Sequence, residues 1–441
     1  MNMKKELYLL CCLLMAVISF ACSDDHNENS YQTTELTVKL EYPESHIAPA
    51  ENVTVILRNA VNSTEYESQT NTSGEALFRI PAGTYEASAT ETRTEGTEVT
   101  IYNGVNANVV IGNQPVSITL KMTASSGGSV VIKELYIGGC PDDEGGKGFN
   151  LDQSVTLYNN SVATVDLSDL AFAMVNPYNA TSANKDYVNG ELFYKTEEWT
   201  PAGMAVWHFN DHVSLEPGKQ IVINMCGAID NTVTYSQSIN YANPDYYCFY
   251  DPASGMTHPR YYPTPASAIP SSHYLGAMVY GLGNGWPLSQ VSPAFFLFRP
   301  EGTTLQAFVD DPNTTNYYGG NQSMGRKKVP NKWIVDGIEV FKKGESGALK
   351  RLTEAVDAGY IETTGRLGYA LYRNVDKAAT ETLDENKGKL VYNYNGGAEG
   401  STDPCGIDAE ASLKNGARIV FQDTNNSSKD FHLRAKSSLR N

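Results

Sequence analysis

The chain is 441 residues long and carries a formal net charge of −17 at pH 7, from 50 acidic and 33 basic residues. This length allows two or three domains. Nucleic acid and anionic membrane surfaces repel a strongly acidic protein, so the charge argues against both as partners.

The N-terminal segment reads as a signal peptide. Two lysines precede an apolar run over residues 7–20, which is shorter than the ~20 residues that a membrane-spanning helix needs. The run ends at Ala21-Cys22, which resembles the lipobox of bacterial lipoproteins, where cleavage precedes a cysteine that receives a diacylglycerol. We therefore expect residues 1–21 to be removed and Cys22 to be lipidated. Ser19 stands where a lipobox usually has a branched residue, so ordinary secretion with cleavage nearby remains an alternative.

The residues after this cysteine indicate a cellular address. Ser23, Asp24 and Asp25 resemble the acidic export signal that sends Bacteroidota lipoproteins to the outer face of the outer membrane. Residues 22–33 are polar and without periodicity, so they predict a flexible tether. The expected location is the outer membrane, with the lipid as anchor and the domains facing outward from the cell surface.

Residues 34–123 show the two-residue alternation of half-buried β-strands. In the first run, Leu36, Val38 and Leu40 share one face, while charged and threonine side chains share the other. Further short runs of the same kind follow, separated by turn residues. Strands at this spacing predict an all-β sandwich of about ninety residues.

One turn in this region carries a specific pattern. An alternating strand leads into Pro81-Ala82-Gly83, and Tyr85 follows at the start of the next strand. Pro81 and Gly83 supply the turn, and Tyr85 can fill the core. The pattern resembles the prealbumin-like, carboxypeptidase-regulatory type of β-sandwich. In its relatives this module is a spacer or accessory fold, so we expect a structural role here.

A small-residue segment at 124–128, Ala-Ser-Ser-Gly-Gly, marks the domain boundary. We expect it to be a linker, and residues 129–441 to form a second domain that folds separately. Several motifs there resemble the lamin-tail type of immunoglobulin-like sandwich; they lie at 157–159, 165–168, 215–223, 228–232 and 420–431. The resemblance implies a larger C-terminal β-sandwich with long loop insertions. The predicted fold class of the whole chain is mainly β.

Together these patterns resemble one family of uncharacterised Bacteroidota surface lipoproteins, with a prealbumin-like module followed by a lamin-tail-like domain. Such proteins often accompany TonB-dependent outer-membrane transporters, and the family brings no known catalytic residue. The chain departs from the pattern between residues 374 and 418, where a polar insertion precedes the last strand. Helical content should be low, and residues 347–357 are the best candidate for a short helix.

The sequence contains no HExxH, GxSxG or Walker motif. Its histidines are scattered, and no serine or cysteine in a strained elbow accompanies Asp211-His212. We therefore expect no enzyme activity and no cofactor. Four cysteines remain besides the lipidated one, and they either form disulfides, in one of three connectivities, or stay as buried thiols: Cys140, Cys226, Cys248 and Cys405.

The turn near the C-terminus offers hard oxygen ligands at alternate positions, which suits calcium. Its residues are Asp423, Asn425, Ser427 and Asp430. The same spacing suits a polar turn that caps its own backbone amides. The lamin-tail resemblance falls on this turn and favours the structural role. We assign no metal and keep calcium as an alternative.

Aromatic residues gather between residues 240 and 287, interleaved with prolines. Exposed tyrosine and tryptophan provide rigid contact surface with a polar handle, which suits a glycan, a peptide or a protein partner. The selected candidates for ligand or partner contact are Tyr246, Tyr247, Tyr261, Tyr262 and Trp286. The alternative is that these rings pack a proline-rich loop against the sandwich.

Three functions remain open at this point. The first, which we favour, is a non-catalytic surface lipoprotein that serves as an accessory binding component of a TonB-dependent nutrient uptake system. The second is a structural or adhesive surface protein. The third is a hydrolase, which the absence of a recognisable catalytic set disfavours.

Overall fold

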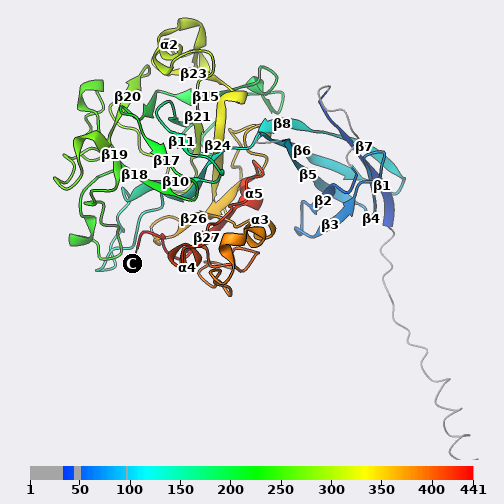
Figure 1. Cartoon of the computed structure of the whole chain (residues 1–441). Helices are drawn as coiled ribbons and strands as arrows, with labels where there is room; N and C mark the ends of the chain where they lie inside the picture. The colour runs from blue at the N-terminus through cyan, green and yellow to red at the C-terminus, as the bar shows by residue number, and fades with distance from the viewer. Residues whose placement is uncertain (1–32, 44–50, 96–97, 441) are drawn as a thin grey trace, which may run out of the picture.

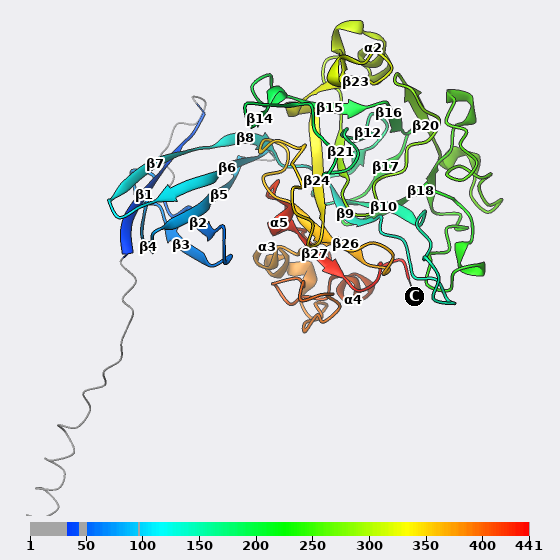
Figure 2. The ribbon, with the colours of Figure 1, turned by 180° about the vertical axis from the view of Figure 1, so that it is seen from behind.

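The protein forms two units that lie side by side, a small N-terminal sandwich and a larger C-terminal unit (Figures 1 and 2). The structure is a computed structural model, and it describes residues 33–43, 51–95 and 98–440. The secondary structure is mainly β, which confirms the predicted fold class.

The N-terminal unit is a sandwich of two sheets around one apolar core. One sheet has the order β4-β1-β7, and the other has the order β3-β2-β5-β6-β8. Leu36, Val38 and Leu40 all point into the core, as their alternation predicts. Tyr85 is fully buried there, and its hydroxyl donates to the carbonyl of Pro81 at 2.9 Å across the predicted turn. The strands are β1 Thr33–Glu41, β2 Thr54–Asn59, β3 Glu65–Gln69, β4 Glu75–Pro81, β5 Gly83–Glu95, β6 Glu98–Ile111, β7 Val116–Lys121 and β8 Thr123–Ser126.

The junction between the units is held by polar contacts. Strand β8 occupies most of the segment expected to be a linker, and it pairs with β6. At Gly128 the backbone N–H donates to Asp423 at 3.0 Å, and a Cβ at this glycine would lie 2.4 Å from a backbone carbonyl oxygen. Asn103 of the small unit donates to the carbonyl of Thr424 at 2.7 Å. Whether the two units fold separately stays a prediction.

The C-terminal unit is built on one twelve-stranded sheet, of order β25-β24-β21-β12-β16-β20-β19-β18-β10-β9-β26-β27. The sheet curls, so that β24, near one end of the strand order, contacts β9, near the other end. There the Asp336 carboxylate accepts a hydrogen bond from the backbone N–H of Ile132 at 2.6 Å. Its concave face encloses the largest apolar core. The strands are β9 Val130–Tyr136, β10 Gln153–Asn159, β12 Ala171–Met174, β16 Ala205–His208, β18 Gln220–Cys226, β19 Tyr247–Phe249, β20 Tyr274–Val279, β21 Ala294–Phe298, β24 Ile334–Lys342, β25 Ile361–Thr363, β26 Ala370–Arg373 and β27 Phe431–Arg434.

Smaller elements cover the outer face of this sheet. A three-stranded sheet, β15-β23-β22, covers one region with helix α2, and the polar insertion covers another with its own small apolar core. The other strands and α-helices of this unit are β11 Val165–Asp166, β13 Tyr187–Val188, β14 Glu191–Leu192, β15 Trp199–Gly203, β17 Ser214–Leu215, β22 Thr315–Tyr317, β23 Gly325–Pro330, α2 Leu305–Asp310, α3 Lys377–Thr382, α4 Ala409–Lys414 and α5 Ser427–Asp430.

The helix predicted at 347–357 does not form, so that prediction is wrong. The segment consists of turns and irregular backbone. The backbone N–H groups of Arg351 and Leu352 donate to the buried carboxylate of Glu339 at 3.0 and 2.7 Å, and the Arg351 guanidinium also binds this carboxylate. These tertiary contacts satisfy the amides in place of intrahelical bonds, which overrides the weak local helix preference.

Candidate functional site

The proposed lipidation and export residues lie outside the described part of the chain. They are Cys22, Ser23, Asp24 and Asp25, and their roles stay predictions. Within the described ranges, no helix is long and apolar enough to cross a membrane.

Two of the five selected aromatic residues belong to the core. Trp286 is fully buried, and its indole N–H donates to the carbonyl of Ala205 at 3.1 Å. Tyr262 is 6 % exposed, accepts a hydrogen bond from the Trp286 backbone N–H at 2.9 Å, and has its pKa raised by burial. For these two residues the structure supports the packing alternative, because neither ring is available to a ligand.

The other three selected tyrosines are half-buried, and two of them stack on histidines. The ring of Tyr247 lies 4.0 Å from that of His273, and the ring of Tyr261 lies 4.2 Å from that of His258, both nearly parallel. One face of each tyrosine is therefore occupied by protein. Tyr246 differs, because it lines a cavity.

This Tyr246 cavity has a volume of about 550 Å³ and lies between the 232–246 loop and the C-terminal segment. Besides Tyr246, its lining includes Ser236, Asn240, Asn243 and Arg440. The side-chain oxygens of both asparagines accept backbone N–H groups within the loop, at 2.9 Å each, which fixes the two side chains. Among the residues that the structure describes, Arg440 has no ion-pair partner. The cavity therefore presents hydrogen-bond donors beside a half-exposed aromatic ring.

A buried carboxyl group lies behind the wall of this cavity. Asp152 is fully buried and accepts a hydrogen bond from the Tyr136 hydroxyl at 3.0 Å. Burial raises the pKa of Asp152 to about 6, although the hydrogen bond from Tyr136 opposes the shift. The carboxyl is too deep to meet a ligand, so we regard it as part of the support of the cavity wall.

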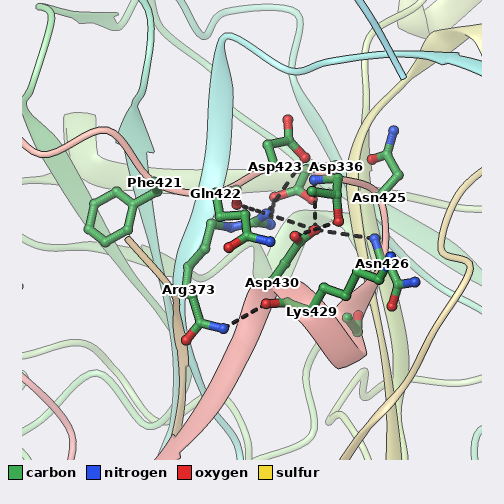
Figure 3. A network of polar contacts seen from close by, with 12 residues as sticks. Asp336, Arg373, Phe421, Gln422, Asp423, Asn425, Asn426, Lys429 and Asp430 are labelled. Atoms are coloured by element: carbon green, nitrogen blue, oxygen red, sulfur yellow. Dashed lines mark hydrogen bonds and ion pairs between the residues drawn. The ribbon is translucent and has the colours of Figure 1, made fainter. Parts of the chain in front are cut away.

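The candidate calcium turn belongs to a buried charge network centred on Arg373 (Figure 3). The guanidinium of Arg373, from β26, binds Asp336 of β24 and lies 3.6 Å from Asp423 and 3.7 Å from Asp430. It also donates to the carbonyls of Ile132 and Gln422 and lies 4.4 Å from the centre of the Phe431 ring. Arg373 thus faces three carboxyl groups, and burial raises the pKa of all three, that of Asp430 to about 6.

Within the turn most side-chain oxygens already have hydrogen-bond partners, whereas Oδ1 of Asp423 accepts no hydrogen bond from the described residues and lies 3.6 Å from the Arg373 guanidinium. The carboxylate of Asp430 accepts the backbone N–H groups of Thr424 and Asn426, at 2.9 and 3.1 Å, and the Thr424 hydroxyl at 2.7 Å. The Ser427 hydroxyl donates to Asp357. This is the self-capping arrangement that we weighed against calcium. In the described ranges, no group of three or more histidine, cysteine or acidic residues is placed to hold a metal ion. Calcium binding at this turn stays an alternative prediction.

The cysteines and histidines form no recognisable catalytic arrangement within the described ranges. Cys140, Cys226, Cys248 and Cys405 are all free thiols, and burial raises the pKa of Cys140, Cys248 and Cys405 to about 12, so they stay protonated. The Nδ1 atom of His212 lies 3.1 Å from the Ser168 hydroxyl and 3.3 Å from Asp166. Both contacts use the same ring nitrogen, and the group is exposed, so His212 is not held between a nucleophile and an orienting carboxylate.

The sequence did not point to the charged residues that line or support these sites. Arg440 is one of several basic residues near the C-terminus, and Arg373 follows a short apolar run without any motif that would mark it as buried. Their partners are distant in the sequence, so only the tertiary fold brings them together. The candidate tyrosines, in contrast, were visible as a local concentration of aromatic residues.

Comparison with known proteins finds a matching family model and similar solved structures. Residues 216–396 match the model of a family described as a protein of unknown function, DUF4876. A crystal structure of a DUF4876 family protein from Bacteroides thetaiotaomicron is 20 % identical, with a TM-score of 0.51 over 90 % of this chain and 94 % of that chain.

Weaker similarities also exist. A DUF3823 family protein from Parabacteroides merdae is 11 % identical over 32 % of this chain and 66 % of that one, with a TM-score of 0.16. The minor pilin of Streptococcus agalactiae is 12 % identical over 67 % of this chain and 90 % of that one, with a TM-score of 0.18. Neither superposes well enough to support an argument, and no curated protein matches. The chain thus contains a region that matches the DUF4876 family, and over most of its length it shares the fold of a DUF4876 protein.

Proposed function

We propose that this protein is a non-catalytic, lipid-anchored surface protein of the outer membrane that binds a ligand or partner through the Tyr246 cavity. We further propose that it is an accessory component of a TonB-dependent nutrient uptake system. The resemblance of residues 19–25 to a lipobox and an export signal supports the location. The observation that carries the binding role is the Tyr246 cavity itself.

The chemistry of the cavity supports binding more than catalysis. Tyr246 offers a partly exposed ring, while Arg440 and the asparagine amides offer donors. A ring beside several donors suits a ligand with an apolar face and many acceptor atoms, such as a sugar or a peptide segment. The lining contains no carboxylate, thiol or imidazole that could act as a nucleophile or general base.

The test is affinity purification of the native protein from membranes, with a Tyr246→Ala variant beside the wild type. The wild type should recover a TonB-dependent barrel or another fixed partner, and the variant should recover about tenfold less. Tyr246→Phe, which keeps the ring, should behave almost as the wild type. Tyr317→Ala is the matched control, because Tyr317 is 45 % exposed and does not line the cavity.

Each outcome bears on the proposal. Recovery of no partner by any of the proteins would favour the structural or adhesive role. Full recovery by a normally folded Tyr246→Ala protein would remove the cavity from the interface. The melting temperature of each variant must be measured in parallel, since a large decrease would mean that Tyr246 acts through stability.

A further inference from the structure

A second cavity lies on the other side of the C-terminal segment, where the polar insertion meets the large sheet. It has a volume of about 620 Å³, which is within the range of small-molecule sites. One wall is the turn that leads into β18, with Lys219 and Gln220, and the opposite wall is helix α4, with Glu410 and Lys414. Figure 1 shows α4 close to the C-terminal end of the chain. We call this site the Lys219–Lys414 cavity.

Behind the cavity lies a buried cation. Lys133 of β9 is fully buried, and its ammonium group contacts the Glu410 carboxylate and the Gln220 side-chain oxygen, the latter at 2.5 Å. The Tyr372 hydroxyl donates to the same carboxylate oxygen of Glu410, Oε1, at 2.6 Å. Because a buried ammonium group is costly to leave unpaired, these contacts hold Glu410 and Gln220 in fixed positions.

Both of these side chains line the cavity, and each keeps one polar atom that is not used in these contacts. In the described part of the chain, Oε2 of Glu410 and the amide nitrogen of Gln220 make no hydrogen bond. Glu410 is ionised, because the Lys133 ammonium and hydrogen bonds from Lys133 and Tyr372 outweigh the effect of burial and lower its pKa. The cavity therefore offers one strong acceptor and one donor whose positions are set before a ligand arrives.

The charge at the cavity is positive, although the protein is acidic. Lys219 and Lys414 are exposed on opposite walls, and within residues 33–43, 51–95 and 98–440 neither has an ion-pair partner. The charge of Glu410 is balanced by Lys133. Two uncompensated ammonium groups remain, in a chain with a net charge of −17. A local positive charge on an acidic protein favours a negatively charged ligand at this cavity.

We propose that the Lys219–Lys414 cavity binds a small ligand that combines an anionic group with hydroxyl groups, such as an acidic monosaccharide unit. Lys219 and Lys414 bind the anionic group, Glu410 accepts a ligand hydroxyl and Gln220 donates to a ligand oxygen. Lysines act as point charges and do not select carboxylate over phosphate, so the shared chemistry is an anionic polyol. This site is separate from the Tyr246 cavity, and the inference does not depend on the proposed function.

Helix α4 lies outside the region that matches the DUF4876 family model, whereas Lys219 and Gln220 lie inside it. One wall of the cavity is thus supplied by the insertion. A protein with a shorter insertion would lack both Glu410 and Lys414, so the inference concerns this chain rather than every protein that shares the fold.

The test is isothermal titration of the soluble protein with three probes: glucuronate, glucose 6-phosphate and glucose. We expect at least one anionic probe to bind saturably. Glucose should show no binding at about 10 mM. K219Q/K414Q should weaken that binding about tenfold or more, and K219R/K414R should retain it. The matched control is K342Q/K387Q, which neutralises two exposed lysines that already pair with carboxylates elsewhere.

The two anionic probes separate a carboxylate ligand from a phosphate ligand, and binding of either supports the site. Three results would overturn the inference: no binding of either anionic probe, equal binding of glucose, or undiminished binding by K219Q/K414Q. A variant whose melting curve departs from that of the wild type is replaced by the corresponding single substitution, K219Q or K414Q. Because both lysines are exposed and unpaired, normal folding is expected.

Discussion

Replacing Arg373 by methionine should destabilise the C-terminal unit strongly at neutral pH. The guanidinium is buried against Asp336, Asp423 and Asp430, and it also satisfies two backbone carbonyls. Methionine fills much of the same space but leaves three buried carboxyl groups without their cation. Removal of one partner from a buried ion pair costs about 3–5 kcal/mol, which should lower the melting temperature by roughly 5–10 °C. Thermal unfolding followed by circular dichroism at pH 7.5 measures the effect.

The size of this loss should depend on pH, and the sign follows from the raised pKa values. Burial raises the pKa of Asp336, Asp423 and Asp430 above the ordinary value of 3.8. A carboxyl with a raised pKa in the folded protein contributes stability below its unfolded pKa, and this stability is lost as the pH rises through the folded pKa. For Asp430 this window runs from about pH 4 to about pH 6. Without Arg373 these pKa values rise further, so the variant should lose more stability between pH 5 and 7.5 than the wild type.

The control is Lys342→Met, which removes an exposed pair with Glu345 whose side chains are 51 % and 37 % exposed. It should change the free energy of unfolding by less than about 1 kcal/mol at either pH. An Arg373→Met protein as stable as this control at pH 7.5 would refute the reasoning. So would a destabilisation that is the same at pH 5 as at pH 7.5, since the penalty would then not come from ionised carboxylates.

Two further predictions concern the membrane address and the aromatic core. Cys22→Ala should move the protein from the membrane fraction to the soluble fraction. Replacing both Asp24 and Asp25 by alanine should leave the protein anchored but protected from protease added to intact cells. A double variant as accessible to protease as the wild type would contradict the export role. Tyr262→Ala should cost about 3–5 kcal/mol of stability, measured by denaturant unfolding, because its ring is packed in the core; a normal unfolding midpoint would show that the ring is dispensable there.

Local patterns predicted the small unit well. The alternation at Leu36, Val38 and Leu40 identified both the first strand and its buried face, and the turn at Pro81 and Gly83 placed Tyr85 in the core. These predictions succeed because strand alternation and turn chemistry depend on residues that are adjacent in the chain.

The aromatic segment shows where such patterns stop being informative. A concentration of tyrosine and tryptophan suits an interface and a core equally well, and the sequence left both open. The structure assigns Tyr262 and Trp286 to the core and leaves Tyr246 at a cavity. Whether a ring is buried or exposed depends on which strands cover it, and the arrangement of the strands is a property of the whole sheet.

The sequence by itself determined that the chain is mainly β and acidic, and that its aromatic residues are concentrated in one segment. The tertiary structure decided how one sheet of twelve strands curls around its core, and which charged residues it buries. Lys133 and Arg373 are typical surface residues by type, yet both are buried because folding brings carboxylates from distant segments to them. A charge can be buried only where a partner compensates the loss of water, and the identity of that partner is set by long-range topology.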